Sequence, residues 1–84
     1  MKILTIIIPV YNEKNTIIKI IDKIKGLNFK KQIIVIDDFS NDGSRDVILE
    51  NKNKIDNLIL HDKNLGKGAA IRSAQKYIEG KFTI

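Results

Sequence analysis

The chain has 84 residues, of which 43% are hydrophobic and 30% are charged. Single domains hold about 50 to 250 residues, so this length admits one small domain and excludes a second core. The balance of hydrophobic and charged residues is typical of a globular protein and excludes a disordered chain. A domain this small buries only about 60–65% of the surface that its unfolded chain exposes, so a homo-oligomer remains open.

The net charge of +5 and the pI near 9.6 would suit a polyanionic partner. The lysines are scattered, however, and no aromatic residues lie between them as platforms for bases, so we expect a solvated surface and no nucleic-acid partner. The absence of cysteine excludes disulfides and thiolate metal sites, in agreement with a cytoplasmic setting. The apolar segment Ile3–Val10 is too short to cross a membrane and lacks a signal-peptide cleavage site.

Four short apolar runs alternate along the chain with segments of helical periodicity. The runs are Ile3–Ile8, Gln32–Ile36, Asn57–Leu60 and Phe82–Ile84. They are rich in Ile and Val and lack polar alternation, which is typical of strands covered on both faces. The pattern predicts an α/β fold with a parallel sheet and helices on its faces. We expect the last strand to be cut short at Ile84, because strands of usual length hold about 5–6 residues.

The segments between the runs predict three helices. Apolar residues at three- and four-residue steps place the first over Glu13–Leu27, with Asn12 as its cap. The second is expected to begin at Ser44. The third is expected over Lys67–Glu79, with Gly80 ending it.

The first candidate cluster follows the first run, at the carboxyl end of the strand, where parallel sheets bind their ligands. Pro9 fixes the direction in which the chain leaves the strand. Tyr11 can line a pocket for a base or ribose, and Glu13 can accept hydrogen bonds from ribose hydroxyls or base amines. A turn followed by a helix cap accounts for the same residues, and that alternative stays open.

The second cluster places adjacent carboxylates, Asp37 and Asp38, at the end of the second run. Successive strand residues point to opposite faces, so only one of the two can face a ligand through its side chain. An acidic residue here can accept hydrogen bonds from a ribose or from the N–H edge of a base. Asp42 and Gly43 are expected to form a turn and Ser44 to cap the next helix. A solvated acidic loop is the alternative.

The third cluster, from Asn64 to Gly68, is typical of a phosphate cradle. Gly66 and Gly68 allow close backbone approach at a helix N-terminus, and Lys67 adds positive charge. The Walker pattern is absent, because it needs a glycine and a Ser or Thr at positions held here by His61 and Gly68. We interpret His61 as a polar residue at a strand end and not as a catalyst.

Together, the segments Ile6–Glu13, Ile34–Ser44 and Asn64–Ala70 resemble, in order and spacing, the opening of the family 2 glycosyltransferases. The resemblance covers nearly the whole chain and is greatest to the polyprenol-phosphate branch, which includes the dolichol-phosphate mannose synthases. It implies the amino-terminal nucleotide-binding part of a GT-A fold. That part is a three-layer, Rossmann-like parallel sheet with strand order 3-2-1-4.

The resemblance also implies the roles of single residues. Asp38 would hydrogen-bond the N–H edge of the base, while Asp37 would support the loop from the opposite side. Where the family usually has glycine, this chain has Phe39. The nucleotide-sugar site would comprise Pro9, Tyr11, Glu13, Ile36, Asp38 and Lys67.

The activity that the resemblance implies is inverting transfer of a hexose from a UDP- or GDP-linked sugar to a polyprenol phosphate or a glycan. A divalent cation, Mg²⁺ or Mn²⁺, would neutralise the departing diphosphate. Its Asp-x-Asp ligands would follow the fourth strand, outside this sequence, as would the catalytic base. A full-length relative with a lipid acceptor would work at the cytoplasmic face of a membrane.

Three other readings compete with this one. A dinucleotide-binding Rossmann domain needs Gly-x-Gly-x-x-Gly at the first turn, where this chain has Pro9 to Lys14. A response-regulator receiver would carry its acidic pair after the first strand and not the second. An inactive remnant that acts as a nucleotide-binding or oligomerisation module stays open.

Overall fold

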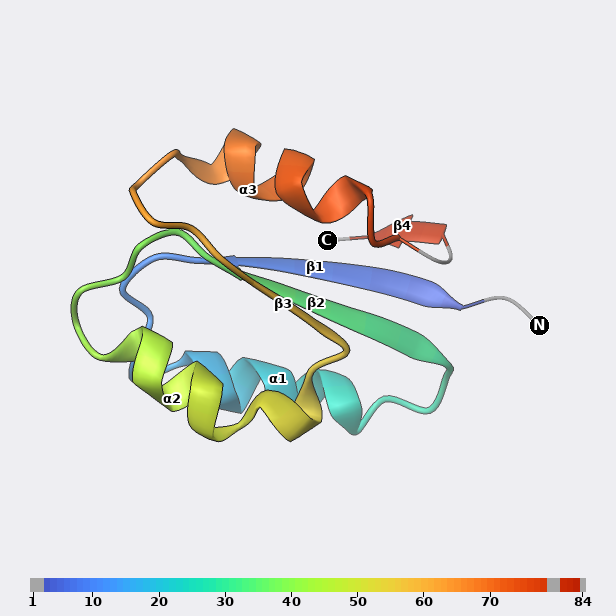
Figure 1. The fold of residues 1–84 in the computed structure, drawn as a ribbon. Helices are drawn as coiled ribbons and strands as arrows, with labels where there is room; N and C mark the ends of the chain where they lie inside the picture. The colour runs from blue at the N-terminus through green and yellow to red at the C-terminus, as the bar shows by residue number, and fades with distance from the viewer. Residues whose placement is uncertain (1–2, 79–80, 84) are drawn as a thin grey trace.

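A computed structural model describes residues 3–78 and the backbone of residues 81–83. Strands and helices alternate along these residues, as Figure 1 shows. The elements are β1 (Leu4–Val10), α1 (Ile17–Lys25), β2 (Lys31–Asp37), α2 (Ser44–Glu50), the 3₁₀ turn η1 (Lys52–Lys54), β3 (Asn57–Leu60), α3 (Lys67–Gln75) and β4 (Lys81–Thr83).

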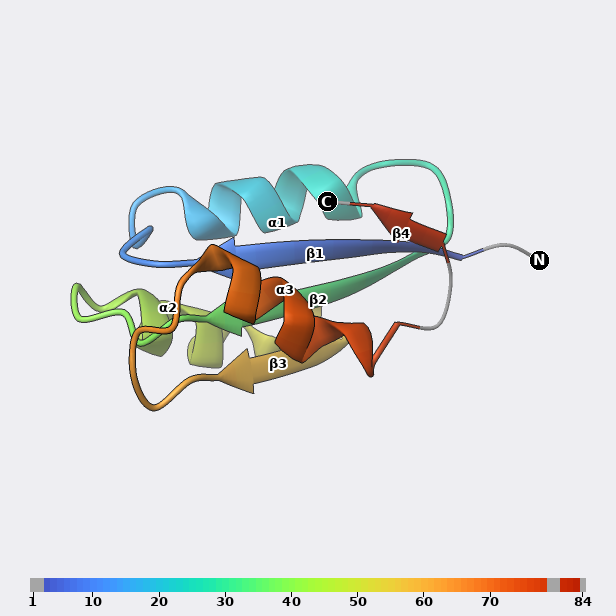
Figure 2. The ribbon, with the colours of Figure 1, turned by 90° about the horizontal axis from the view of Figure 1, so that it is seen from above.

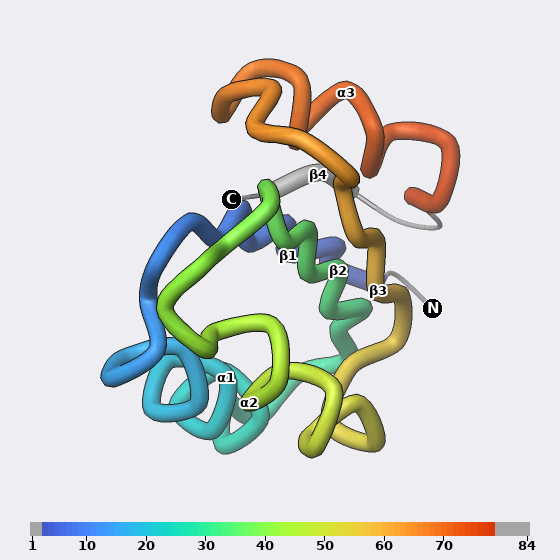
Figure 3. The backbone as a smooth tube through the Cα atoms, turned by 60° about the vertical axis from the view of Figure 1, so that its left-hand side comes forward, coloured from blue at the N-terminus to red at the C-terminus, as the bar shows by residue number. Residues whose placement is uncertain are grey.

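The strands form one sheet in the order β3-β2-β1-β4, and every pair is parallel (Figure 2). Helices α1 and α2 cover one face of the sheet and α3 covers the other, which gives three layers (Figure 3). The α/β class and the parallel sheet expected from the sequence are confirmed. Because β1 and β2 are neighbours, the loops that follow their carboxyl ends lie side by side.

Strand β2 carries the centre of both cores. Its residues Ile33 and Val35 pack under α1 and α2, while Ile34 and Ile36 pack under α3, and each is at most 1% exposed. Burial on both faces explains why the strand shows no polar alternation. Among the residues that the structure describes, no helix is both long and apolar enough to span a bilayer.

A buried polar network at the amino end of the sheet has no counterpart among the sequence predictions. Thr5 Oγ1 donates to Gln32 Oε1 at 2.9 Å across β1 and β2. The amide nitrogen of Gln32 donates to Asn57 Oδ1 at 2.8 Å and to the carbonyl of Tyr77 at 2.6 Å. The network therefore joins three strands to the segment that follows α3.

The first helix is shorter than the periodicity predicts, since it begins at Ile17 and not at Glu13. The carbonyl of Glu13 accepts from the N–H groups of Thr16 and Ile17, so these residues form a turn before the helix. Asn12 does not cap it, because Thr16 is the N-cap and no side chain bonds the helix end. Strand β1 is longer than expected and runs through Pro9 to Val10.

The third helix begins at Lys67 as predicted and ends at Gln75, four residues early. Beyond it, the N–H of Tyr77 bonds the carbonyl of Ala74 and that of Ile78 bonds the carbonyl of Gln75, a tighter 3₁₀-type turn. Gly80, the expected terminator, lies outside the described residues.

Candidate functional site

A cavity of about 220 Å³ opens where the carboxyl ends of β1 and β2 meet the amino end of α3. This is the position at which parallel α/β sheets bind ligands. It brings together most of the site residues predicted from the sequence. The lining residues are Pro9, Val10, Tyr11, Glu13, Asp38, Lys67 and Ala70.

Ile36 is the predicted site residue that does not line this cavity. Its side chain is fully buried and packs with Ile7, Ile34 and Ala70 on the α3 side of the sheet. Ala70 belongs both to this cluster and to the cavity wall. Ile36 therefore lies in the packed layer that supports the wall.

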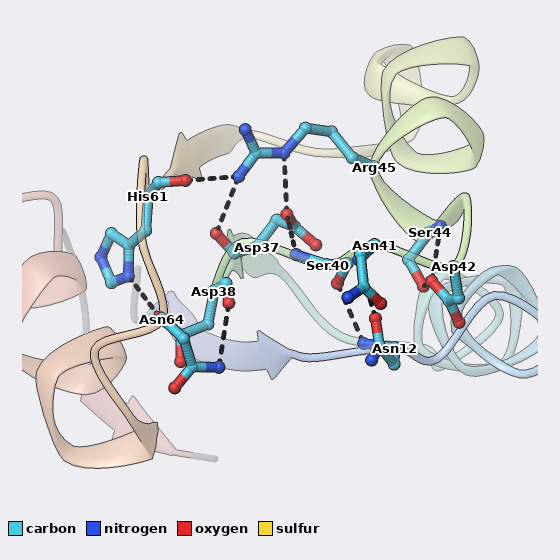
Figure 4. Close-up of polar contacts among 10 residues, drawn as sticks. All are labelled: Asn12, Asp37, Asp38, Ser40, Asn41, Asp42, Ser44, Arg45, His61 and Asn64. Carbon is cyan, nitrogen blue, oxygen red and sulfur yellow. Dashed lines mark hydrogen bonds and ion pairs between the residues drawn. The ribbon is translucent and has the colours of Figure 1, made fainter.

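The loops after β1 and β2 are tied to each other through Asn12 (Figure 4). The backbone N–H of Asn12 donates to Ser40 Oγ, and Asn12 Oδ1 accepts from the N–H of Asn41, both at 2.9 Å. Asn12 has a φ of 55°, a left-handed conformation that asparagine tolerates better than most residues. These bonds replace the helix cap expected of Asn12 and fix the turn that carries Tyr11 and Glu13.

The side chain that accepts a hydrogen bond from the first N–H group of α2 is that of Asp42, and Ser44 does not cap the helix. Asp42 Oδ1 accepts from the N–H of Ser44 at 2.9 Å and also from its hydroxyl. The N-cap residue is Gly43, with a φ of 97°. The expected Ser44 cap is wrong because the preceding aspartate already bonds that side chain, and these bonds lower the pKa of Asp42.

Asp37 points away from the cavity and supports the loop, as the resemblance implies. Its side chain is fully buried, and Oδ2 accepts from Arg45 Nε at 2.8 Å and from the N–H of Ser40 at 3.1 Å. Arg45 Nη2 donates in turn to the carbonyl of His61 at 2.6 Å, which ties α2 to the end of β3 (Figure 4). For Asp37 Oδ1, the described part of the chain provides no hydrogen-bond donor.

Asp38 faces the other way, toward α3, and holds the turn between β3 and α3. Oδ1 accepts from the N–H of Leu65 at 2.8 Å and from His61 Nδ1 at 2.9 Å. Oδ2 accepts from the N–H of Gly66 at 2.8 Å. Burial raises the pKa of Asp38, but the bonds from His61, Leu65 and Gly66 outweigh it, so the pKa is lowered and the carboxylate stays charged.

The beginning of α3 borders the cavity through Lys67 and carries backbone N–H groups that have no acceptor within the helix. Gly66 precedes the helix with a φ of 92°, a conformation that favours glycine, and its N–H is taken by Asp38. The N–H groups of residues 67–69 belong to the first helical turn, which has no acceptors within the helix. A phosphate group here would meet these groups and the Lys67 side chain, and not the N–H of Gly66, which already donates to Asp38.

The backbone conformation at Phe39 is one that favours glycine, the residue usual at this position in the family that the sequence resembles. The φ of Phe39 is 63°, in the left-handed region, and its ring is 49% exposed and lies 5.9 Å from the guanidinium of Arg45. A side chain in this conformation costs about 1–2 kcal/mol. The turn between β2 and α2 therefore stores backbone strain at Phe39.

We expect Phe39→Gly to be more stable than Phe39→Ala by about 0.5–1 kcal/mol, because glycine relieves the backbone strain. Part of this stabilisation is offset because glycine loses more backbone entropy on folding than alanine does. Both variants lose the ring beside Arg45, so the difference between their free energies of unfolding reports the backbone conformation at residue 39. Urea unfolding of the two proteins measures it. A Phe39→Ala protein as stable as Phe39→Gly would contradict the strain.

The divalent cation implied by the resemblance finds no site in the described part of the chain. Across residues 3–78 and 81–83, no group of three or more His, Asp or Glu side chains gathers as a metal site. The carboxylate of Asp38 is engaged by N–H donors, and that of Asp37 by Arg45. The described residues therefore offer no metal site of their own.

Sequence relatives of this chain transfer sugars. It is 27% identical over 92 residues to a dolichyl-phosphate β-glucosyltransferase of Trichomonas vaginalis, covering 96% of this chain and 28% of that protein. It is 32% identical over 90 residues to a poly(ribitol-phosphate) β-glucosyltransferase of Bacillus spizizenii, covering 100% of this chain and 14% of that protein. The chain thus spans less than a third of the length of either relative.

Solved structures share the fold. A mannosyltransferase from Pyrobaculum calidifontis in complex with GDP-Man and Mn²⁺ superimposes with a TM-score of 0.81 at 26% identity, over 92% of this chain and 24% of that one. TarS 1-349 of S. aureus in complex with UDP-GlcNAc gives 0.80 at 25% identity, over 99% and 26%. Both confirm the GT-A type of fold. The sequence model of "Glycosyl transferase family 2" matches residues 5–84, nearly the whole chain, and the chain therefore belongs to this family.

Proposed function

We propose that the cavity between β1, β2 and α3 binds the nucleoside diphosphate of a sugar nucleotide. The observation that carries this proposal is the gathering of Tyr11, Glu13, Asp38 and Lys67 around one opening. An aromatic ring, two carboxylates and a cation are the groups that a base, a ribose and a diphosphate require. The complexes of the Pyrobaculum mannosyltransferase with GDP-Man and of TarS with UDP-GlcNAc support it.

Each residue has a separate task in this proposal. The Tyr11 ring, 47% exposed, packs against the base or ribose. One carboxylate oxygen of Glu13 accepts from the Thr16 hydroxyl at 2.8 Å, which orients the other toward ribose hydroxyls. Asp38, an acceptor only, takes an N–H of the base, and Lys67 with the first turn of α3 faces the diphosphate.

The proposed reaction is inverting transfer of a hexose from a UDP- or GDP-linked donor. An acceptor oxygen attacks the anomeric carbon, and the nucleoside diphosphate leaves with the electrons of the broken C–O bond. An ionised phosphate oxygen has no proton to lose, whereas the proton of a glycan hydroxyl passes to the catalytic base expected outside this sequence. A polyprenol phosphate or a glycan is the proposed acceptor, and the first places the reaction at the cytoplasmic face of a membrane. The residues of this chain bind and orient the donor.

A second candidate is nucleotide binding without transfer, with or without self-association. The cavity of about 220 Å³ is smaller than the pockets of about 300–1,000 Å³ that enclose drug-sized ligands. A turnover assay with sugar nucleotides and manganese separates the two candidates when it is run on a protein that also holds the Asp-x-Asp and the catalytic base implied by the resemblance. A sizing column tests self-association.

We expect Tyr11→Ala to weaken the binding of UDP and GDP about fivefold, near the lower end of the roughly 1–3 kcal/mol that base–aromatic stacking contributes. The matched control is Tyr77→Ala, since Tyr77 is 39% exposed and lies outside the cavity. Isothermal titration calorimetry measures both. Equal effects of the two variants, or no binding by the parent protein, would contradict the proposed site.

A further inference from the structure

A chain of hydrogen bonds, buried at Asp38 and partly buried at Ser73, runs behind the proposed nucleotide site from Asp38 to α3. His61, only 7% exposed, bonds Asp38 Oδ1 through Nδ1 and Ser73 Oγ through Nε2, both at 2.9 Å (Figure 4 shows the first bond). An ionised carboxylate only accepts, so Nδ1 carries the proton. His61 and Ser73 do not line the cavity, so they can act on it only through Asp38 and α3.

Both the main chain and the ring of His61 are held by hydrogen bonds. Its backbone N–H donates to the carbonyl of Asp37 at 2.9 Å, and its own carbonyl accepts from Arg45 at 2.6 Å. With Ser73 on Nε2, the ring has one orientation in which Nδ1 faces Asp38. The orientation of the ring therefore fixes the direction of the hydrogen bond from His61 Nδ1 to Asp38 Oδ1.

Asp38 links the His61 ring to the beginning of α3. Its carboxylate bonds the N–H groups of Leu65 and Gly66, the two residues that precede the helix. Lys67, the first residue of α3, lines the cavity beside Asp38. The direction of the Asp38 carboxylate thus sets both the acceptor offered to a base and the turn that leads to Lys67.

Building on the proposed function, we propose that His61 is a positioning residue of the nucleotide site. It fixes the Asp38 carboxylate against the turn before α3, so that Asp38 and the first turn of α3 are in place before the nucleotide binds. Preorganisation of this kind improves affinity by removing an ordering cost from binding.

Two substitutions separate the two side-chain bonds of His61. In His61→Asn, the amide nitrogen takes the place of Nδ1, keeping the donor to Asp38 and losing the contact with Ser73. In His61→Gln, the amide nitrogen takes the place of Nε2, keeping the contact with Ser73 and losing the donor to Asp38. Each variant loses one side-chain hydrogen bond, the buried one to Asp38 or the partly buried one to Ser73. Bonds to charged groups contribute more to stability than neutral ones, so affinity is compared at equal folded fraction.

We expect His61→Gln to bind UDP and GDP about tenfold more weakly than the parent protein, and His61→Asn to stay within about threefold. Without nucleotide, hydrogen exchange at the Leu65 and Gly66 amides should be about tenfold faster in His61→Gln and nearly unchanged in His61→Asn. Calorimetry and exchange measured by NMR give the two readouts, and urea unfolding gives the folded fraction.

Other outcomes overturn the inference. If both variants lose affinity equally, or if His61→Asn loses more, the bond to Asp38 is not the one that matters. If neither variant changes affinity or amide exchange, His61 positions nothing. A parent protein that binds neither nucleotide refutes the proposed function, whereas the exchange rates still decide whether His61 holds the turn.

Discussion

Replacing Arg45 by alanine is expected to lower the free energy of unfolding by about 3–5 kcal/mol, because it leaves the buried carboxylate of Asp37 without its ion-pair partner. Asp37 is fully buried and lies 2.8 Å from Arg45 Nε, and Oδ1 already has no donor within the described residues. Domains of this size have about 4–13 kcal/mol in total, so Arg45→Ala would largely unfold a parent protein near the lower limit and leave one near the upper limit folded.

The matched control is Lys54→Ala, which breaks an ion pair of similar length at the surface. Lys54 Nζ and Asp22 Oδ1 lie 2.9 Å apart, but their side chains are 31% and 54% exposed. Water screens such a pair, and we expect its loss to cost less than about 1 kcal/mol. Urea unfolding of both variants measures the contrast.

A second substitution identifies the cause. In the Arg45→Ala protein, adding Asp37→Asn removes the uncompensated charge, so the double variant should be more stable than Arg45→Ala alone. If the two losses simply add, or if Arg45→Ala costs no more than Lys54→Ala, the buried charge is not what Arg45 stabilises.

Asp38→Asn is expected to weaken the binding of UDP and GDP by about 10- to 150-fold, which corresponds to roughly 1.5–3 kcal/mol. The amide removes the charged acceptor proposed for the base. It also places an NH₂ donor against one of the N–H groups of Leu65, Gly66 and His61 that the carboxylate accepts. The turn before α3 should loosen as the acceptor is lost.

Asp37→Asn is the matched control for Asp38→Asn, since it makes the same change one residue earlier, on the opposite face of β2. It should lower stability through Arg45 and leave the affinity of the folded protein within about threefold. Calorimetric titration, corrected for the folded fraction from urea curves, compares the two. Equal losses of affinity would show that Asp38 does not face the nucleotide.

Local patterns in the sequence determined the sheet and the place of the site. Unbroken runs of Ile and Val predicted strands buried on both faces, and the structure has them in β1 and β2. A parallel arrangement follows from the alternation of strands and helices, and it brings the first residues after each strand to one edge. The sequence therefore predicts that the clusters around Tyr11, the two carboxylates and Lys67 meet at that edge, and all three clusters contribute to the cavity wall.

The sequence also limited the choice between the carboxylates. Alternation along β2 required Asp37 and Asp38 to point to opposite faces, and the structure has Asp37 toward Arg45 and Asp38 toward α3. The resemblance alone assigned the faces, since alternation does not say which one carries the ligand.

Tertiary structure decided the contacts that hold the site in shape. Asp38 meets His61 across 23 positions of sequence, and Asn41 meets Asn12 across 29. Such pairs leave no periodic signal, because they depend on how neighbouring loops are placed when the sheet forms. The same cause explains the errors at Asn12 and Ser44, where a residue suited to capping a helix was bonded by a distant loop or by its own neighbour. Sequence periodicity fixes which face a residue takes, but only the packed sheet determines which side chain stands opposite it.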